Sequence, residues 1–291
     1  MKSISGAKTN IYNRLPLIIA KKEIGPKIKL IKVLSPLISA KSKPGHFVIL
    51  RVTEHGERIP LTIADNDVDE GSITLVFLEI GKTTTDLGKL GEGENIVDLV
   101  GPLGNSADIQ NFGRTVLVGG GVGAAAIYPE AKALKNAGNY VISVIGARDR
   151  DLLVFEDEIR KVSDEFYIST DNGSKGQKGF VTDVVKDLIE NHKPINRVIA
   201  IGPTIMMKAV SDTTKPHNIE TIVSLNPIMV DGTGMCGSCR VSVGGETKFA
   251  CVDGPEFDAH KVDFNLLLSR LKMYRNKELM SLEHVNGPCL T

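Results

Sequence analysis

The first third of the chain alternates short apolar runs with turn residues. Between residues 17 and 109, the runs at 47–52, 61–64, 73–80 and 95–100 are rich in Val, Ile, Leu and Phe. Turn residues separate them, as in Pro44-Gly45 and in Gly91-Glu92-Gly93. Short β-type runs at this regular spacing are typical of an antiparallel barrel or sandwich.

From Arg114 onward, apolar strand patterns alternate with helical patterns. Strands are predicted at 115–118, 141–145, 166–169, 198–201 and 221–225, and helices at 124–136, 156–162, 181–191 and 204–211. This alternation indicates a doubly wound parallel sheet. The remainder is rich in Gly and contains Cys up to residue 264, and it is amphipathic after that.

The changes of pattern predict a multi-domain β plus α/β protein. We expect an N-terminal extension (1–16), an antiparallel β-barrel (17–109), a doubly wound parallel-sheet nucleotide domain (110–226), a small cysteine module (227–264), and a C-terminal helix and tail (265–291). Residues 1–16 contain three basic residues and no acid. We interpret them as a flexible terminus in preference to an organelle transit peptide.

Composition and charge exclude several classes of protein. The 35 Lys and Arg residues balance the 35 Asp and Glu residues, so no overall positive field favours nucleic acid. No apolar run approaches the ~20 residues of a spanning helix, and the start of the chain lacks the apolar core of a secretory signal. We therefore expect neither nucleic-acid binding nor membrane insertion, and a cytoplasmic location.

Three of the four cysteines lie in one Gly-rich segment. With one aspartate they follow the spacing D-x4-C-x2-C-x11-C: Asp231, Cys236, Cys239 and Cys251. This is the plant-type ferredoxin pattern with Asp in place of the first Cys, and a carboxylate can also ligate iron. Structural zinc usually takes paired knuckles, and a disulfide needs an oxidising compartment. We expect a 2Fe-2S cluster, with zinc as the rival and Cys289 as an alternative fourth ligand or a free thiol.

A glycine run follows the first strand of the predicted sheet and opens a helix. It consists of Gly119, Gly120, Gly121, Val122 and Gly123. Backbone amides at such a helix start bind a pyrophosphate, although a glycine run alone is often only a tight turn.

Two charged residues follow the next two predicted strands. Arg148 is either a solvated charge or a contact to nucleotide phosphate or adenosine. Asp171 either makes an Asx turn or accepts from a ribose 2′-hydroxyl and repels a 2′-phosphate, which favours NAD(H) over NADP(H).

The order of these motifs resembles the ferredoxin-NADP reductase superfamily. The resemblance rests on Arg58-Ile-Pro-Leu-Thr62, Gly81-Lys-Thr-Thr-Thr-Asp-Leu87, the glycine run, Gly202-Pro203 and the cysteine loop. Within it, the chain is similar to the electron-transfer subunit of bacterial dihydroorotate dehydrogenase. It is still more similar to the small subunit of NADH-dependent reduced ferredoxin:NADP oxidoreductase, also called sulfide dehydrogenase, because Asp231 replaces the first Cys.

The resemblance implies FAD on the barrel, NADH on the parallel sheet, and a 2Fe-2S cluster in the C-terminal module. It also implies a larger flavin and iron–sulfur partner subunit, with ferredoxin reached through that complex. Arg58 and Thr62 would contact the flavin and its phosphate, or merely pair across strands, and Leu61 would lie where many relatives have a stacking Tyr. The flavin pyrophosphate would lie on Gly81, Lys82, Thr83, Thr84 and Thr85, and the nucleotide site would include Gly202 and Pro203.

Two departures from the family pattern stand out. Arg58 lies one residue further from Thr62 than the usual R-x-Y-S spacing, and Gly123-Ala-Ala-Ala126 lacks the usual final Pro. No acid–base catalytic residue is expected, since the cofactors carry the chemistry. The sequence thus predicts an oxidoreductase subunit, with a zinc-stabilised, non-enzymatic interaction module as the alternative from another class.

Overall fold

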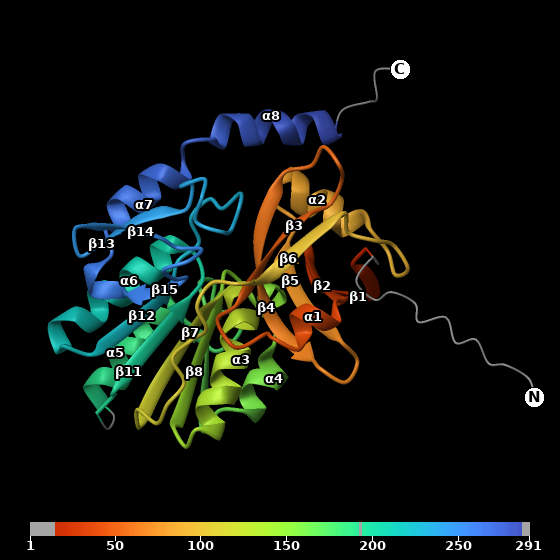
Figure 1. Ribbon diagram of the computed structural model, residues 1–291. Coiled ribbons are helices and arrows are strands. Elements are labelled where there is room, and N and C mark those ends of the chain that lie inside the picture. The colour runs from red at the N-terminus through yellow and green to blue at the C-terminus, as the bar shows by residue number, and fades with distance from the viewer. Residues whose placement is uncertain (1–14, 192–193, 287–291) are drawn as a thin grey trace, which may run out of the picture.

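The computed structural model describes residues 15–191 and 194–286, and Figure 1 shows a barrel beside an α/β sheet. Most of the predicted N-terminal extension, and Cys289, lie outside the described residues. No helix in the described ranges is long and apolar enough to cross a membrane.

The barrel is a six-stranded antiparallel sheet with strand order β1-β2-β5-β4-β3-β6. Its strands are β1 (Leu17–Gly25), β2 (Ile28–Leu34), β3 (Phe47–Arg51), β4 (Arg58–Asp67), β5 (Ser72–Leu78) and β6 (Asp98–Leu103). Leu17 bridges to Asn95, which brings β1 to the segment just ahead of β6. The barrel segment also contains two helices, α1 (Pro36–Ser39) and α2 (Lys82–Lys89). The expected antiparallel β-barrel is therefore confirmed.

The second sheet has seven strands in the order β10-β9-β8-β7-β11-β12-β15. These strands are β7 (Arg114–Gly120), β8 (Tyr140–Ala147), β9 (Glu165–Thr170), β10 (Gln177–Lys178), β11 (Arg197–Ile201), β12 (Glu220–Ser224) and β15 (Glu256–Asp258). All neighbours pair in parallel except β15, which runs antiparallel to β12. The chain starts at β7 in the middle, proceeds through β8 and β9 to the edge strand β10 and then crosses to β11, so the strand order reverses between β7 and β11.

Helices cover both faces of this sheet. The helices are α3 (Gly123–Asn136), α4 (Glu156–Lys161), α5 (Val181–Asn191) and α6 (Thr204–Thr214), with 3-10 turns at Arg150–Leu152 and Lys215–His217. Leu117 packs with α3 residues, whereas Val116 and Val118 on the other face pack with α5 and α6 residues. Ala64 and Val76 of the barrel join the α3 cluster, so the barrel packs against α3. The expected doubly wound domain is confirmed.

The C-terminal module contains a hairpin, two helices and the last strand of the sheet. Its elements are β13 (Arg240–Val243), β14 (Glu246–Phe249), β15, a 3-10 turn at Ala259–Lys261, α7 (Phe264–Leu271) and α8 (Arg275–Asn286). Helix α8 lies beside α2 of the barrel (Figure 1). Strand β15 is part of the seven-stranded sheet, although it lies in the cysteine module expected to begin at residue 227. The two units therefore share a sheet across the boundary expected at residue 226.

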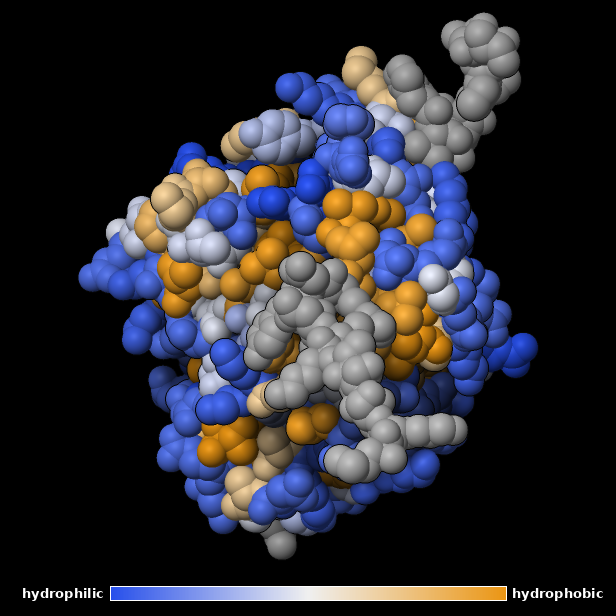
Figure 2. Space-filling view, turned by 45° about the vertical axis from the view of Figure 1, so that its right-hand side comes forward, coloured by the Kyte–Doolittle hydropathy of each residue, from blue (hydrophilic) through white to orange (hydrophobic). Residues whose placement is uncertain are grey.

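Figure 2 brings the barrel side of the molecule forward and shows apolar side chains in separate groups among polar ones. Exposed apolar residues also occur on the cysteine loop, where Met235 is 88% exposed and Val230 46%.

Candidate cofactor sites

The start of helix α2 presents free backbone amides at the edge of the barrel. Gly81 caps the helix, and the Thr84 hydroxyl accepts from the amides of Gly81 at 3.0 Å and Ile80 at 3.2 Å. The next amides, of Lys82 and Thr83, have no intrahelical acceptor by their position. A Cβ on Gly81 would meet only Thr84 Oγ1, at 3.9 Å, so the approach to these amides is open. The helix dipole and the amides together favour an anion such as a pyrophosphate.

The predicted flavin contacts on β4 are held by neighbouring strands. Arg58 lies 3.6 Å from Asp98, which Arg51 contacts more closely at 2.6 Å. Leu61 packs partly on the barrel core, and Thr62 pairs with Phe47 of β3. The cross-strand pairing weighed for Arg58 is thus present, while its side chain stays 42% exposed.

The glycine run lies where the strand order of the sheet reverses. Ile201, the last residue of β11, pairs with Gly119 of β7, so Gly202 and Pro203 lie beside the run. A Cβ on Gly202 would come within 3.0 Å of Gly120, and a Cβ on Gly123 would overlap the Ile201 carbonyl. Only glycines allow the two loops to approach this closely. Such a crevice at the carboxyl ends of the strands is the usual place for a dinucleotide.

Arg148 and Asp171 lie at the same edge, on the loops after β8 and β9. The Asp171 amide donates to the Ala147 carbonyl at 3.1 Å, so the two loops are joined through the backbone. Both side chains are exposed. The two predicted residues therefore lie on neighbouring loops, at the same edge of the sheet as the glycine run.

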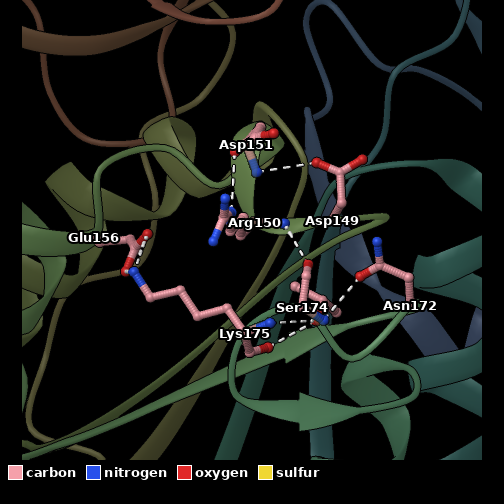
Figure 3. Close-up of polar contacts among 8 residues, drawn as sticks. Asp149, Arg150, Asp151, Glu156, Asn172, Ser174 and Lys175 are labelled. Carbon is pink, nitrogen blue, oxygen red and sulfur yellow. Dashed lines mark hydrogen bonds and ion pairs between the residues drawn. The ribbon is translucent and has the colours of Figure 1, made fainter.

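Figure 3 shows how these loops are held and how their cations are paired. The Arg150 amide donates to the Ser174 hydroxyl at 2.9 Å, which ties one loop to the other. Lys175 pairs with Glu156 at 2.7 Å, and Arg150 with Asp151 at 3.4 Å. The third cation on these loops is Arg148. Unlike Lys175 and Arg150, it has no carboxylate within 4 Å among the described residues. Arg148, on the loop that the Asp171 amide joins, therefore stays a candidate contact for a nucleotide.

The cysteine loop brings two of its thiols together. The Sγ atoms of Cys239 and Cys251 are 3.2 Å apart, and both residues are 2% exposed. Burial, and then the hydrogen-bonding contact with the Cys239 thiol and its charge, raise the pKa of Cys251 to about 12. Cys236 lies on the exposed part of the loop, where hydrogen bonds from the Ser238 hydroxyl and the Ser238 amide lower the pKa of its thiol.

Asp231 closes the turn at the start of this loop. Its Oδ2 accepts from the Thr233 hydroxyl and from the amides of Thr233 at 3.1 Å and Met235 at 3.4 Å. The hydroxyl, then the amides and the more distant Arg58, lower the pKa of the carboxyl group. Asp231 thus caps the loop, and its carboxylate is ionised and available to a cation.

The donor set fits a two-iron cluster better than a single ion. Within residues 15–191 and 194–286, no three Asp, Glu, His or Cys side chains converge on one metal position. A 2Fe-2S cluster needs two ligands per iron, and Cys239 with Cys251 forms such a pair. Gly232, Gly234 and Gly237 adopt φ values of +82°, +83° and +67°, which keeps this loop free of side chains that would fill the space.

The cysteine loop packs directly on the barrel. A Cβ on Gly232 would come within 2.7 Å of Leu103 and 2.8 Å of Ile49. Asn105, which follows β6, donates from its backbone to the Gly254 carbonyl at 2.6 Å and from its side chain to the Val252 carbonyl at 3.1 Å. The loop is therefore held against the domain expected to bind flavin.

Sequence reasoning missed three groups of residues around these sites. Asn105 joins two domains, Arg240 and Arg270 contact the cysteine loop, and Glu130 is fully buried within α3. Of these, only the burial of Glu130 could have been predicted from the sequence, because Glu130 is in helical phase with the apolar Ile127 and Leu134. The others depend on tertiary contacts that no local pattern encodes.

Comparison with known proteins agrees with this architecture. Residues 226–263 match the family model described as the iron–sulfur cluster binding domain of dihydroorotate dehydrogenase B. The dihydroorotate dehydrogenase B (NAD(+)) electron transfer subunit homolog of Thermotoga maritima is 49% identical over 267 residues, which cover 90% of this chain and 94% of that protein. The probable electron transfer subunit of Methanopyrus kandleri is 34% identical over 224 residues, or 77% of this chain and 82% of that protein.

Solved structures agree as well. The structure of an NADH-dependent reduced ferredoxin-NADP oxidoreductase contains a chain that is 47% identical, with a TM-score of 0.89, covering 94% of this chain and 99% of that one. Phthalate dioxygenase reductase, 18% identical with a TM-score of 0.56 over 79% of this chain and 86% of its own, shares the fold. The cofactor set expected from the sequence, FAD, a 2Fe-2S cluster and NAD(H), is confirmed at the level of this family. The chain belongs to the ferredoxin reductase-like family of electron-transfer subunits typified by that of dihydroorotate dehydrogenase B.

Proposed function

We propose that this chain is the NADH-dependent electron-transfer subunit of a complex of the reduced ferredoxin:NADP oxidoreductase or sulfide dehydrogenase type. The observation that carries the proposal is the packing of an Asp-containing cysteine loop on the flavin-type barrel within one chain. Residues from both sides form a shared apolar cluster, including Phe47 and Ile49 of the barrel and Cys239 and Cys251 of the loop. The 47% identity to the chain from the NADH-dependent complex supports this assignment.

Each predicted site then has a defined role in holding a cofactor. The α2 start, Gly81 to Thr85, with Arg58, Leu61 and Thr62, holds FAD. The glycine run with Gly202, Pro203, Arg148 and Asp171 holds NAD(H). Asp231, Cys236, Cys239 and Cys251 would hold the 2Fe-2S cluster. Bound together, these groups supply hydride exchange between nucleotide and flavin and one-electron exchange at the cluster.

The chain's own residues orient and separate these groups. The glycine run brings a nucleotide to the edge of the sheet that faces the barrel, and Asn105 keeps the cysteine loop on that barrel. Exposed Met235 and Val230 give the loop an apolar rim suited to a larger partner subunit with its own flavin and iron–sulfur groups. Ferredoxin would be reached through that partner, in the cytoplasm.

Anaerobic purification tests the proposal. The protein should carry about one FAD and two irons per chain, its flavin should be reduced by NADH, and a larger flavin and iron–sulfur subunit should co-purify. Zinc without iron would instead identify a structural interaction module, and absence of flavin would also reject the proposal.

The second candidate is an electron-transfer subunit of dihydroorotate dehydrogenase. The family match over residues 226–263 and the Thermotoga relative favour it. A co-purified large subunit that oxidises dihydroorotate would select this candidate over the first.

A further inference from the structure

We propose that Arg240 and Arg270 raise the reduction potential of the iron–sulfur cluster by donating to the two carbonyl groups between Cys236 and Cys239. The inference rests on the proposed function, because it concerns the cluster assigned to this loop. The two residues come from different elements, β13 and α7, and converge on the same short loop. Arg240 Nη1 donates to the Gly237 carbonyl at 2.9 Å, and Arg270 Nη2 to the Ser238 carbonyl at 3.1 Å.

Each arginine acts on a peptide group in the short segment between the predicted ligands Cys236 and Cys239. The Gly237 carbonyl and the Ser238 amide belong to one peptide group, and the hydroxyl of Ser238 lies 3.2 Å from the Cys236 sulfur. A guanidinium on the carbonyl polarises the peptide and so makes the Ser238 amide a stronger hydrogen-bond donor. The Ser238 carbonyl and the Cys239 amide form the next peptide group, so Arg270 acts in the same way one residue along.

The charge of the two guanidinium groups adds to this effect. Among the described residues, neither Arg240 nor Arg270 has a carboxylate within 4 Å, whereas the nearby Lys261 pairs with Asp258 at 3.1 Å. Both arginines line one pocket together with apolar Ile228, Leu267 and Leu271. Arg270 is half-buried among these apolar residues, which weakens the screening of its charge, whereas Arg240 is exposed.

Reduction adds one electron, and therefore one negative charge, to a group already held by three thiolates and a carboxylate. No bond of the chain forms or breaks in this step. Cationic and hydrogen-bonding groups around an iron–sulfur cluster favour the more negative, reduced state. The arginines thus favour the reduced cluster.

The simpler explanation is that both arginines only hold the loop in shape. A structural role would show as loss of iron, whereas tuning shows as a shifted potential with the iron retained. Lysine keeps the positive charge but lacks the planar guanidinium group of arginine, so the lysine variants test the contribution of charge alone.

Redox titration followed by EPR separates these explanations. We compare Arg240→Gln and Arg270→Gln with Arg240→Lys and Arg270→Lys in the anaerobically purified protein, with iron and sulfide measured in each. At a fixed potential, each Gln variant should have a reduced-to-oxidised ratio about tenfold lower, equivalent to ~59 mV for one electron. The Lys variants should retain most of the wild-type ratio. Lys261→Gln, which removes a paired cation from the same module, should leave the ratio unchanged.

Two results would overturn the inference. One is an unshifted potential in Gln variants with full iron content, and the other is loss of the cluster from Gln and Lys variants alike. A wild-type protein without a 2Fe-2S signal would reject the proposed function itself, so the two failures are distinguishable.

Discussion

At the scale of single residues, Asp231 has one role that the structure shows and one that stays a prediction. Its spacing to Cys236 predicted an iron ligand, and the structure adds three hydrogen bonds that close the turn. The two roles are compatible, because the carboxylate has a second oxygen, Oδ1. The ligand role remains a prediction, and substitution separates it from the cap.

Asp231→Cys should still assemble the cluster, because it restores four thiolates at unchanged spacing. Its potential should fall, since a thiolate donates more charge to iron than a carboxylate does. Asp231→Ala should yield a labile cluster with less iron. An EPR redox titration checks this, and an unshifted potential in Asp231→Cys would show that Asp231 only caps the loop.

Asp171 is expected to select NADH by repelling the 2′-phosphate of NADPH. Asp171→Asn removes that charge, so the ratio of flavin-reduction rate constants for NADH and NADPH should fall about fivefold, as for one unit charge at ~4 Å in water. Stopped-flow flavin reduction measures both constants. Asp157→Asn, an exposed carboxylate on neighbouring α4, is the matched control. Faster reduction of the wild type by NADPH would refute the assignment.

At the scale of elements, the sequence predicted the helices and strands that have a clear period of apolar residues. The runs around Leu117 and Ile199 are buried strands, and Ala124 to Leu134 follow helical phase, so β7, β11 and α3 were found. Helix α2 was not predicted, because Lys82-Thr83-Thr84-Thr85 has weak helical preference and depends on the Thr84 cap. Strand β15 spans only Glu256–Asp258 and exists because β12 leaves an edge to pair with, which no local pattern reveals.

The buried Glu130 of α3 makes stability depend on pH. Burial, then the charge of nearby Glu256, raises the pKa of Glu130 well above its usual value, and neither oxygen of the Glu130 carboxyl group has a hydrogen-bond partner among the described residues. The folded chain therefore keeps a proton that the unfolded chain releases, so this contribution is present below the unfolded pKa and is lost as pH rises toward the folded pKa.

Glu130→Gln replaces the protonated acid with a neutral group of the same shape. It should raise Tm at pH 8.5 by a few degrees, on the order of 2–4 °C for each ~1 kcal/mol, and have little effect at pH 5. Calorimetry at the two pH values measures this. Glu158→Gln on exposed α4 is the control, and an equal change at both pH values would contradict the prediction.

At the scale of the whole molecule, the sequence predicted the order of the domains but not how they meet. The contact of Asn105 with Val252 spans 147 positions, and the cysteine motif beside Val252 does not indicate which distant residue it contacts. The cofactor residues were found because glycine and cysteine patterns encode local loop geometry. The contacts that set the spacing between cofactors arise only once the chain is folded.

Asn105→Ala tests the contact between the cysteine loop and the barrel. It removes the side-chain bond to the Val252 carbonyl and leaves the backbone bond to Gly254, so it should cost about 1 kcal/mol of stability. Cluster reduction after mixing with NADH should slow, while flavin reduction keeps its wild-type rate. Asn191→Ala, which removes a side-chain hydrogen bond to Asp187 of the same helix, is the control. If flavin reduction and cluster reduction slowed equally, the effect would not come from the contact between the cysteine loop and the barrel.

The antiparallel pairing of β15 with β12 has a consequence for how the protein matures. The walls of the cysteine loop come from the barrel, through Leu103 and Asn105, and from the edge of the nucleotide sheet, through Ser224 paired with Glu256. During synthesis from the N-terminus, Leu103, Asn105 and Ser224 emerge from the ribosome before Cys236, whereas Glu256 emerges only after Cys251. The sheet edge beside the cysteine loop is thus completed after the last predicted ligand has been made, so we expect iron and sulfide to be inserted only once β15 has paired with β12.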